Sequence, residues 1–420
     1  MNLRIFPPEE MLDANVKLPL SKSISNRALI INALSGSSQS IGPVAKCDDT
    51  DVMVTALTSD SDCVNIGAAG TAMRFLTAFF ASQEHRTVTI DGTERMRHRP
   101  IKALVDALRN CGADIEYANE EGFPPLHING RRLQGGKISL SASISSQYIS
   151  AILMIAPMME QGVELTLEGD IISRPYIEMT LSLMKQWGVE STFSNNVITI
   201  KPQRYNAIDF TVEADWSAAS YWYEIAALSS GFVSLNGLYK NSDQGDSNIA
   251  TFMECLGVIT EFEDDVVNLQ PSPEISPRLN LDLSDQPDLA QTIVVTSCML
   301  GIPFHLTGLS TLKIKETDRL EALRTEMRKM GFVLEIERDS QLIWEGVRVP
   351  ISQMPVFETY EDHRMAMALA PIALMLPGIV INNAEVVSKS YPEYWQHLQE
   401  AGFRFADADA PIITDEQDPS

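Results

Sequence analysis

The chain lacks the cysteine patterns that build metal sites, redox pairs and disulfide frameworks. Its five cysteines stand at positions 47, 63, 111, 255 and 298, an odd number with no CxxC pair and no metal-ligand spacing. We therefore expect buried free thiols in a reducing compartment, and no metal. The N-terminal segment MNLRIFPPEE also lacks the basic and then apolar pattern of a secretory signal, so we expect a cytoplasmic protein.

Positive charge is also scarce. The sequence holds 32 Lys and Arg against 56 Asp and Glu, a net charge of −24, which argues against nucleic acid or an anionic membrane as a partner. The one membrane-like run, Met365–Ile381, is interrupted by Pro371, Pro377 and Gly378, so it predicts a buried helix followed by a strand rather than a membrane span. A length of 420 residues is too great for one small core and favours two domains.

What the chain does have is a repeat. Six clusters of small or polar residues each precede helix-forming apolar residues, which predicts six helix N-termini: Lys22-Ser23, Gly70-Thr71, Ser145-Ser146-Gln147, Asp215-Trp216-Ser217, Asp285-Gln286-Pro287-Asp288 and Asp362-His363-Arg364. From Gly70 to His363 the clusters recur at steps of 76, 71, 71 and 75 residues. Helix N-termini carry partial positive charge and free N–H groups, so helix starts that face one place would form an anion site.

A second series has nearly the same period. Five apolar helical stretches each end at a glycine and continue into a strand-like segment, with glycines at Gly112, Gly188, Gly257, Gly331 and Gly402, spaced 76, 69, 74 and 71 residues apart. Glycine just after the last apolar helical position is the expected helix stop. Two interleaved series at one period indicate a chain built from a repeated unit.

Each unit is expected to have the order α-β-α-β-β. The helix of the first series precedes a short strand, such as 163–169 (VELTLEG) or 304–309 (FHLTGL), and the glycine-stopped helix precedes a two-stranded hairpin. The unit before Gly70 is shorter, because its helix, 49–58, continues into SDSDCVNIGAAG with no glycine stop and little room for a hairpin. The expected fold class is therefore α/β (α+β), with one of six units shortened.

The same clusters belong to longer motifs. Nine of them, in chain order, are LPLSKSISNRAL (18–29), GAAGTAMR (67–74), RMRHRP (95–100), SSQYISAILM (145–154), SRPYIEMTL (173–181), QPDLAQT (286–292), KIKETDRL (313–320), TYEDHRMAMALA (359–370) and SKSYPEYW (388–395). With these motifs the chain resembles the 5-enolpyruvylshikimate-3-phosphate synthases, the enolpyruvyl transferases of the shikimate pathway, over essentially its whole length.

The resemblance implies a two-domain, inside-out α/β barrel of repeated βαβαββ units, with helices inside and sheets outside. Transferred to this chain, residues 20–213 form one domain, which holds the phosphate-binding motifs. Residues 1–19 and 214–420 form the other domain, and the chain crosses between the two domains twice. The substrate cleft is expected between them, where the repeat helices direct their N-termini.

The resemblance also implies an activity. Phosphoenolpyruvate is joined to the 5-hydroxyl of shikimate 3-phosphate, giving a tetrahedral ketal phosphate that then loses inorganic phosphate. No cofactor is implied, and the expected state is a monomer. Two phosphates and two carboxylates must be held side by side, so the site needs several cations despite the net charge of −24. Arginine forks suit carboxylate and phosphate, whereas lysines act as compact charges.

By resemblance, two sets of residues hold the substrates. The set for shikimate 3-phosphate is Lys22, Ser23, Arg27, Ser145, Ser146, Gln147, Ser173, Asp288 and Lys315. The set for phosphoenolpyruvate, the subsite that glyphosate occupies in this family, is Lys22, Gly70, Arg97, Gln147, Arg319, Arg364 and Lys389.

Three residues are the candidates for proton transfer. By resemblance Asp288 is the base for the hydroxyl, and Glu316 handles the proton at C3, with Lys22 as the other candidate. A carboxylate between Lys315 and Arg319 is expected to be ionised, so its use as an acid needs substrate charge to raise its pKa. The choice between Glu316 and Lys22 stays open at this point.

Four positions depart from the family pattern. Leu20 and Phe75 stand where glycine and proline are usual, and Ala68 and Thr311 stand where asparagine is usual. None of these removes a charged catalytic position, so we expect activity with an altered phosphoenolpyruvate pocket.

Two alternative functions are considered. One is enolpyruvyl transfer to UDP-N-acetylglucosamine, but that family carries a loop cysteine where this chain has RMRHRP. The other is a non-catalytic anion-binding relative, which only the shortened unit suggests. Single motifs are weak alone: KETDRL could be an ordinary helix start with Thr317 as its N-cap.

Overall fold

The strands of the described residues form five separate four-stranded sheets. A computed structural model describes residues 1–36, 41–142, 145–229, 231–351 and 353–408. In each sheet one edge pair is parallel, and the other two pairs are antiparallel. A parallel pair requires a crossover, whereas an antiparallel pair can close through a hairpin. This is the pattern of a βαβαββ unit and confirms the α/β class. Each described sheet stays open, and none closes into a barrel.

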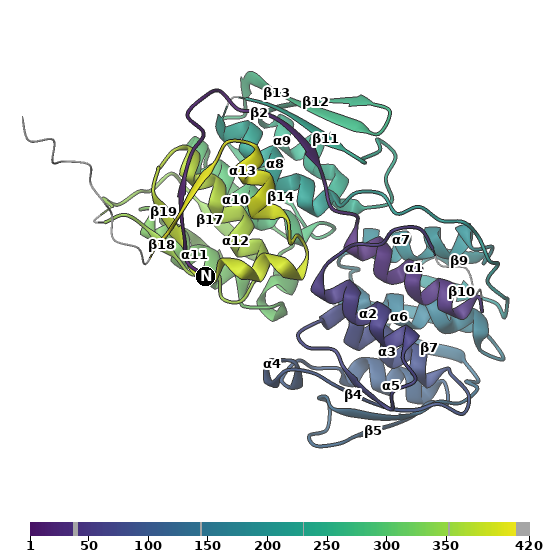
Figure 1. The fold of residues 1–420 in the computed structure, drawn as a ribbon. Coiled ribbons are helices and arrows are strands. Elements are labelled where there is room, and N and C mark those ends of the chain that lie inside the picture. Colours follow the sequence, from purple (N-terminus) through teal and green to yellow (C-terminus); the bar gives the residue numbers. More distant parts are fainter. Residues whose placement is uncertain (37–40, 143–144, 230, 352, 409–420) are drawn as a thin grey trace, which may run out of the picture.

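The ribbon divides into two lobes, and the first, which contains α1 to β10, has two whole units (Figure 1). One consists of β3 (Cys63–Asn65), α3 (Gly70–Ala81), β4 (Thr87–Asp91), α4 (Glu94–Arg97), α5 (Lys102–Asn110), β5 (Asp114–Tyr117) and β6 (Leu126–Asn129). The other consists of β7 (Gly136–Ser141), α6 (Ser146–Ile155), a 3-10 helix (Ala156–Met158), β8 (Val163–Glu168), α7 (Arg174–Gln186), β9 (Ser191–Ser194) and β10 (Val197–Ile200). The shortened unit is reduced, in the described residues, to α1 (Lys22–Leu34) and α2 (Asp48–Thr58) with no sheet of its own.

The second lobe contains three units, and the N-terminal strands complete two of them. The first is β2 (Asp13–Lys17), α8 (Trp216–Ser229), β11 (Phe232–Asn236), a 3-10 helix (Gly245–Asn248), α9 (Ile249–Glu254), β12 (Leu256–Glu263) and β13 (Val266–Ile275). The second is β14 (Leu279–Asp282), a 3-10 helix (Pro287–Leu289), α10 (Ala290–Leu300), β15 (Phe304–Thr307), a 3-10 helix (Ser310–Ile314), α11 (Arg319–Lys329), β16 (Glu335–Glu337) and β17 (Gln341–Trp344). The third is β18 (Val356–Phe357), α12 (His363–Leu369), β19 (Ile379–Ile381), α13 (Tyr394–Glu400), β20 (Arg404–Asp407) and β1 (Leu3–Phe6), with 3-10 helices at Ala370–Leu374 and Ala384–Lys389.

The helix boundaries follow the two repeat series. A helix or 3-10 helix begins within or directly after each of the six predicted clusters. All five predicted stop glycines have positive φ, between 83° and 98°, a region that favours glycine because it has no Cβ. One detail is wrong: α11 is capped not by Thr317 but by Asp318, whose carboxylate accepts from the Glu321 N–H at 3.2 Å.

The buried side chains form two separate clusters. One comes from positions between 24 and 212, and the other from positions 5–18 and 214–403. In α3, eleven of twelve residues are buried, and α6, α10 and α12 are covered almost as fully. Helices therefore fill the interior, and the sheets lie outside them (Figure 1). We propose that each cluster is the core of one domain, with boundaries near residues 20 and 213.

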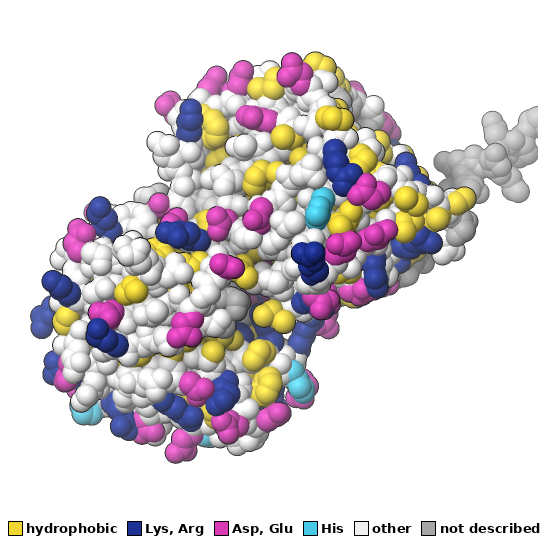
Figure 2. All heavy atoms as spheres, turned by 180° about the vertical axis from the view of Figure 1, so that it is seen from behind, with side chains coloured by type: hydrophobic (Ala, Val, Ile, Leu, Met, Phe, Trp, Pro, Cys, Tyr) yellow, Lys and Arg dark blue, Asp and Glu magenta, His cyan; other side chains and the backbone are white. Residues whose placement is uncertain are grey.

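The outer surface mixes both signs of charge over the face that Figure 2 shows, where the junction between the lobes is hollowed. Among the described residues, no helix is long and apolar enough to cross a membrane. The predicted membrane-like run instead supplies α12 and β19, as expected. All five cysteines are free, and three of them are buried.

Close packing between β6 and α3 gives a test of this architecture. A Cβ at Gly130 would collide with the carbonyl oxygen of Gln83 and lie 2.6 Å and 2.8 Å from those of Phe80 and Arg86. Backbone oxygens cannot rotate away, so Gly130→Ala should lower the free energy of unfolding by about 2–3 kcal/mol in urea titrations. Gly42→Ala, which meets one backbone oxygen at 3.0 Å, is the control and should cost less. Equal stabilities would contradict the packing.

Candidate active site

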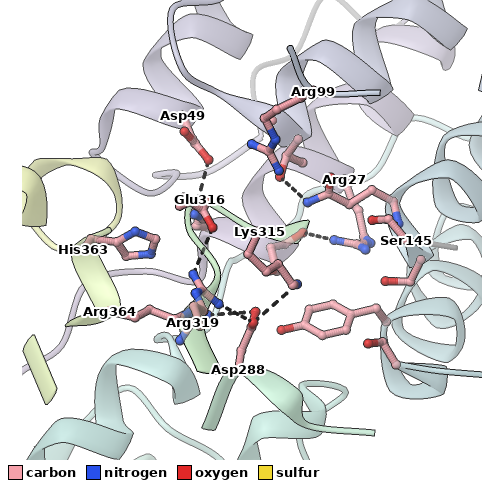
Figure 3. A pocket seen from close by; sticks show the side chains of 18 residues that line it. Arg27, Asp49, Arg99, Ser145, Asp288, Lys315, Glu316, Arg319, His363 and Arg364 are labelled. Carbon is pink, nitrogen blue, oxygen red and sulfur yellow. Dashed lines mark hydrogen bonds and ion pairs between the residues drawn. The ribbon is translucent and has the colours of Figure 1, made fainter. Parts of the chain in front are cut away.

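A cleft of about 740 Å³ lies between the two lobes (Figure 3). Every expected site residue lines it except Arg97 and Lys389. The first lobe contributes Lys22, Ser23, Arg27, Asp49, Gly70, Thr71, Arg99, Ser145, Ser146, Gln147, Ser173 and Tyr176. The second contributes Asp288, Lys315, Glu316, Arg319, His363 and Arg364.

Helix N-termini from both lobes meet at the cleft. Lys22, Gly70, Ser146 and His363 are the first residues of α1, α3, α6 and α12, and Ser173 stands directly before α7. Five of the six predicted helix-start clusters supply residues that line the cleft, and the cluster Asp215-Trp216-Ser217 does not. The partial positive charges of these helix starts therefore add to those of the side chains.

Asp288 is the carboxylate at the centre of the cleft. It lies 2.8 Å from Arg319 Nη1, 3.2 Å from Arg364 Nη2 and 3.4 Å from Lys315 Nζ. Figure 3 shows these three cations converging on it. Burial disfavours the charged carboxylate, but Lys315, Arg364 and Arg319 outweigh burial and hold the pKa of Asp288 far below its usual range. Asp288 is therefore ionised, and in the empty cleft the three cations make it a weak base.

Arg319 joins the elements of the second lobe that carry the site. Its side chain is 1% exposed and contacts Asp288, Glu316 at 3.0 Å and Asp362 at 2.7 Å. Asp362 in turn caps α12 by accepting from the Arg364 N–H at 2.9 Å. Burial disfavours the guanidinium charge, but the three carboxylates raise the pKa of Arg319 above its ordinary value. One buried cation thus fixes α11, α12 and Asp288 in one arrangement.

Glu316 lies between two cations. Its carboxylate contacts Arg319 Nη2 at 3.0 Å and Lys389 Nζ at 2.8 Å. Lys389 is therefore beside the cleft, in contact with a residue that lines it. Burial opposes ionisation, yet Lys389 and Arg319 hold the pKa of Glu316 well below its usual range. In this state Glu316 has no proton to donate.

Lys22 faces the cleft from the first lobe. Its Nζ lies 3.3 Å from Asp49 Oδ2, and both side chains are largely buried, at 17% and 5% exposure. Burial lowers the pKa of Lys22, but the nearby Asp49 carboxylate more than compensates and the pKa stands above its ordinary value. Lys22 is therefore protonated, and its raised pKa makes it a weak acid in the empty cleft.

The structure places Arg97 differently from the expectation. Its guanidinium forms an ion pair with Asp91, in which Nε donates to Oδ1 at 2.9 Å. The Arg97 side chain is 40% exposed and lies outside the cleft. Arg99, two residues later, enters the cleft instead. It lies over the start of α3, since a Cβ at Gly70 would be 2.5 Å from its Nη1. Within RMRHRP the sequence gives three arginines and no means to rank them, because the four-residue helix α4 decides which one turns inward.

Four other residues that line the cleft were absent from the expected set: Asp49, Thr71, Tyr176 and His363. Three of them lie within the quoted motifs, and their phase in the repeat was the available signal. Asp49 carried none, because it stands in the shortened unit, where it resembles an ordinary acidic residue of a first helical turn. Among the described residues, no group of His, Cys, Asp and Glu is arranged to hold a metal ion.

Three kinds of comparison place the chain among known proteins. The model of the family described as EPSP synthase (3-phosphoshikimate 1-carboxyvinyltransferase) matches residues 7–60 and 55–398. The two matches meet at the end of α2, where the shortened unit lacks its sheet. An EPSP synthase structure from Acinetobacter baumannii superposes with a TM-score of 0.78 at 20% identity, covering 97% of this chain and 100% of that one, which supports the fold.

Curated relatives agree over nearly their whole lengths. A Bacteroides fragilis (strain YCH46) protein named 3-phosphoshikimate 1-carboxyvinyltransferase is 54% identical over 394 residues, 93% of this chain and 96% of the relative. A protein of the same name from Sulfurovum sp. (strain NBC37-1) is 37% identical over 428 residues, 95% and 99% of the two chains. The chain belongs to the EPSP synthase (3-phosphoshikimate 1-carboxyvinyltransferase) family.

Proposed function

We propose that this chain transfers the enolpyruvyl group of phosphoenolpyruvate to the 5-hydroxyl of shikimate 3-phosphate and releases inorganic phosphate. The relatives that are named after this activity align with almost the whole chain. The proposal rests most directly on one observation: a cleft between the lobes that gathers cations in a strongly acidic chain.

The charge of the cleft suits two anionic substrates. Six cations line it, Lys22, Arg27, Arg99, Lys315, Arg319 and Arg364, against three carboxylates, Asp49, Asp288 and Glu316. The excess of positive charge stands within a chain of net charge −24. Only anions held at close range offset such a local excess, and phosphate and carboxylate groups match the arginine forks.

Proton transfer can be divided between the two lobes. Asp288, ionised by its three cations, would accept the proton of the attacking hydroxyl. Lys22 is protonated and would supply the proton to C3, whereas Glu316 is ionised between Arg319 and Lys389. Glu316 could take a proton only after substrate anions draw those two cations away. Of the two candidates, Lys22 alone holds a proton in the empty site.

The residues proposed to bind each substrate come from both lobes. Ser23, Arg27, Ser145, Ser146 and Ser173 gather on the first lobe and would hold shikimate 3-phosphate, together with Lys315 and Gln147. Arg99 takes the place expected for Arg97 and, with Gly70, Arg319, Arg364 and Lys389, would hold phosphoenolpyruvate. We further propose that the enzyme works in the cytoplasm as a monomer, on small molecules and without nucleic acid.

A substrate comparison tests the proposed function. Phosphate release should occur with phosphoenolpyruvate and shikimate 3-phosphate, and not with phosphoenolpyruvate and UDP-N-acetylglucosamine. None of the described residues that line the cleft is a cysteine, which speaks against the loop cysteine of the alternative family. Release only with the sugar nucleotide would replace the proposal with that alternative. Release with neither acceptor would favour a non-catalytic anion-binding relative.

The assignment of Asp288 can be tested with an isosteric change. Asp288→Asn keeps the side-chain shape but cannot accept the hydroxyl proton, so kcat should fall by about 10²–10⁴. The KM for shikimate 3-phosphate should change far less, because three cations remain. Asp285→Asn, on the same loop but outside the cleft, is the control and should retain activity. Near-normal turnover by Asp288→Asn would show that another group is the base.

The proposal that Arg99, rather than Arg97, binds phosphoenolpyruvate can be tested by comparing two alanine variants. Arg99→Ala should raise the KM for phosphoenolpyruvate about ten- to a hundredfold, the usual loss for a hydrogen bond to a charged group. Arg97→Ala removes a surface ion pair with Asp91 and should change that KM less than about twofold. Steady-state kinetics with varied phosphoenolpyruvate measure both. The reverse order of effects would restore Arg97 as the binding residue.

A further inference from the structure

Arg27 is a buried cation without a carboxylate partner. Its side chain lies on α1 and the residue is 2% exposed. Nε donates to Thr180 Oγ1 at 2.8 Å, Nη1 to the Ser23 carbonyl oxygen at 2.8 Å and Nη2 to Ser150 Oγ at 3.2 Å. All three acceptors are neutral, and no ion pair of Arg27 occurs in the described part of the chain. The charge is thus left for an anion that enters the cleft.

Two aromatic rings flank the guanidinium. Its Cζ lies 5.3 Å from the centre of the Phe75 ring and 5.7 Å from that of Tyr176. Tyr176 lines the cleft, whereas Phe75 does not. Phe75 belongs to α3, is 1% exposed and approaches Arg27 from the interior of the lobe. The face of an aromatic ring attracts a cation, most strongly where water is excluded.

We propose that Phe75 is a positioning residue for acceptor binding, because it holds the Arg27 guanidinium in the orientation that receives the anionic acceptor. This inference rests on the proposed function, in which Arg27 contacts shikimate 3-phosphate. Proline, usual at this position in the family, offers no aromatic face, so the support is a property of this chain. Phe75 never touches substrate and acts only through Arg27.

The neighbouring contacts show why a ring is needed there. Ser150, Thr180 and Ser23 fix the nitrogens within the guanidinium plane, since each accepts one N–H. These three acceptors contact the edge of the guanidinium and leave its two faces to other groups. The Phe75 ring, on the inner side, and the Tyr176 ring contact the guanidinium and resist tilting of its plane. A tilt of a fork that binds an anion through two parallel hydrogen bonds would weaken both bonds.

The test compares two phenylalanines of the same helix. Phe75→Leu removes the ring from Arg27 and should raise the KM for shikimate 3-phosphate about three- to tenfold, while the KM for phosphoenolpyruvate changes less than about twofold. Phe79→Leu is the control. Phe79 is also buried on α3, but its ring packs against Phe80, with centroids 5.4 Å apart. Phe79→Leu should therefore leave both KM values nearly unchanged.

A double-mutant cycle shows whether the effect passes through Arg27. In an Arg27→Ala background, adding Phe75→Leu should change the KM for shikimate 3-phosphate by less than about 1.5-fold. An undiminished effect in that background, or equal losses in both KM values, would overturn the proposal and leave Phe75 as ordinary core packing. Failure of the proposed function itself is distinct, because the unmodified enzyme would then show no turnover with shikimate 3-phosphate.

Discussion

The whole site depends on the burial of Arg319 among carboxylates. At 1% exposure its charge would be very costly without Asp288, Glu316 and Asp362 around it. Asp362 is fully buried, and Asp288 and Glu316 are largely buried, so these carboxylates also depend on the positive charge of Arg319. Removing one partner of such a group leaves a buried charge less compensated and destabilises the site. Because Asp362 also caps α12, the same ion group fixes the backbone that presents Arg364.

The carboxylates have a second consequence for the empty site. Asp288 contacts three cations and Glu316 contacts two, so the cations that would bind phosphate and carboxylate are already neutralised in part. Substrate anions must compete with these internal partners. As they do so, the cations that depress the pKa values of Asp288 and Glu316 are shared with substrate, and both carboxyl groups become better proton acceptors. Binding and proton transfer are thus linked through the same ion pairs.

The sequence predicted those parts of the fold that local chemistry determines. Stop glycines need positive φ and helix starts need polar caps, so both series were visible and correct. The sequence did not reveal the leading strands β2, β3, β7, β14 and β18, since each pairs in parallel with a strand that lies beyond an intervening helix. The resemblance named Arg97 from RMRHRP, whereas Arg99 lines the cleft. Which arginine faces the cleft depends on the turn after α4, and that turn is a tertiary property.

The shortened unit shows what the site requires of a repeat. It has no sheet among the described residues, yet α1 and α2 remain packed together, with Thr50 Oγ1 donating to Asn26 Oδ1 at 2.9 Å. These helices bring Lys22 and Asp49 within 3.3 Å of each other in the cleft. Asp48, next in the chain, accepts from Ser388 of the other lobe at 2.8 Å. The inner helices carry the charges and the contact between lobes, whereas the sheet of a unit only covers their outer side. A unit can therefore lose its sheet and still supply its part of the site.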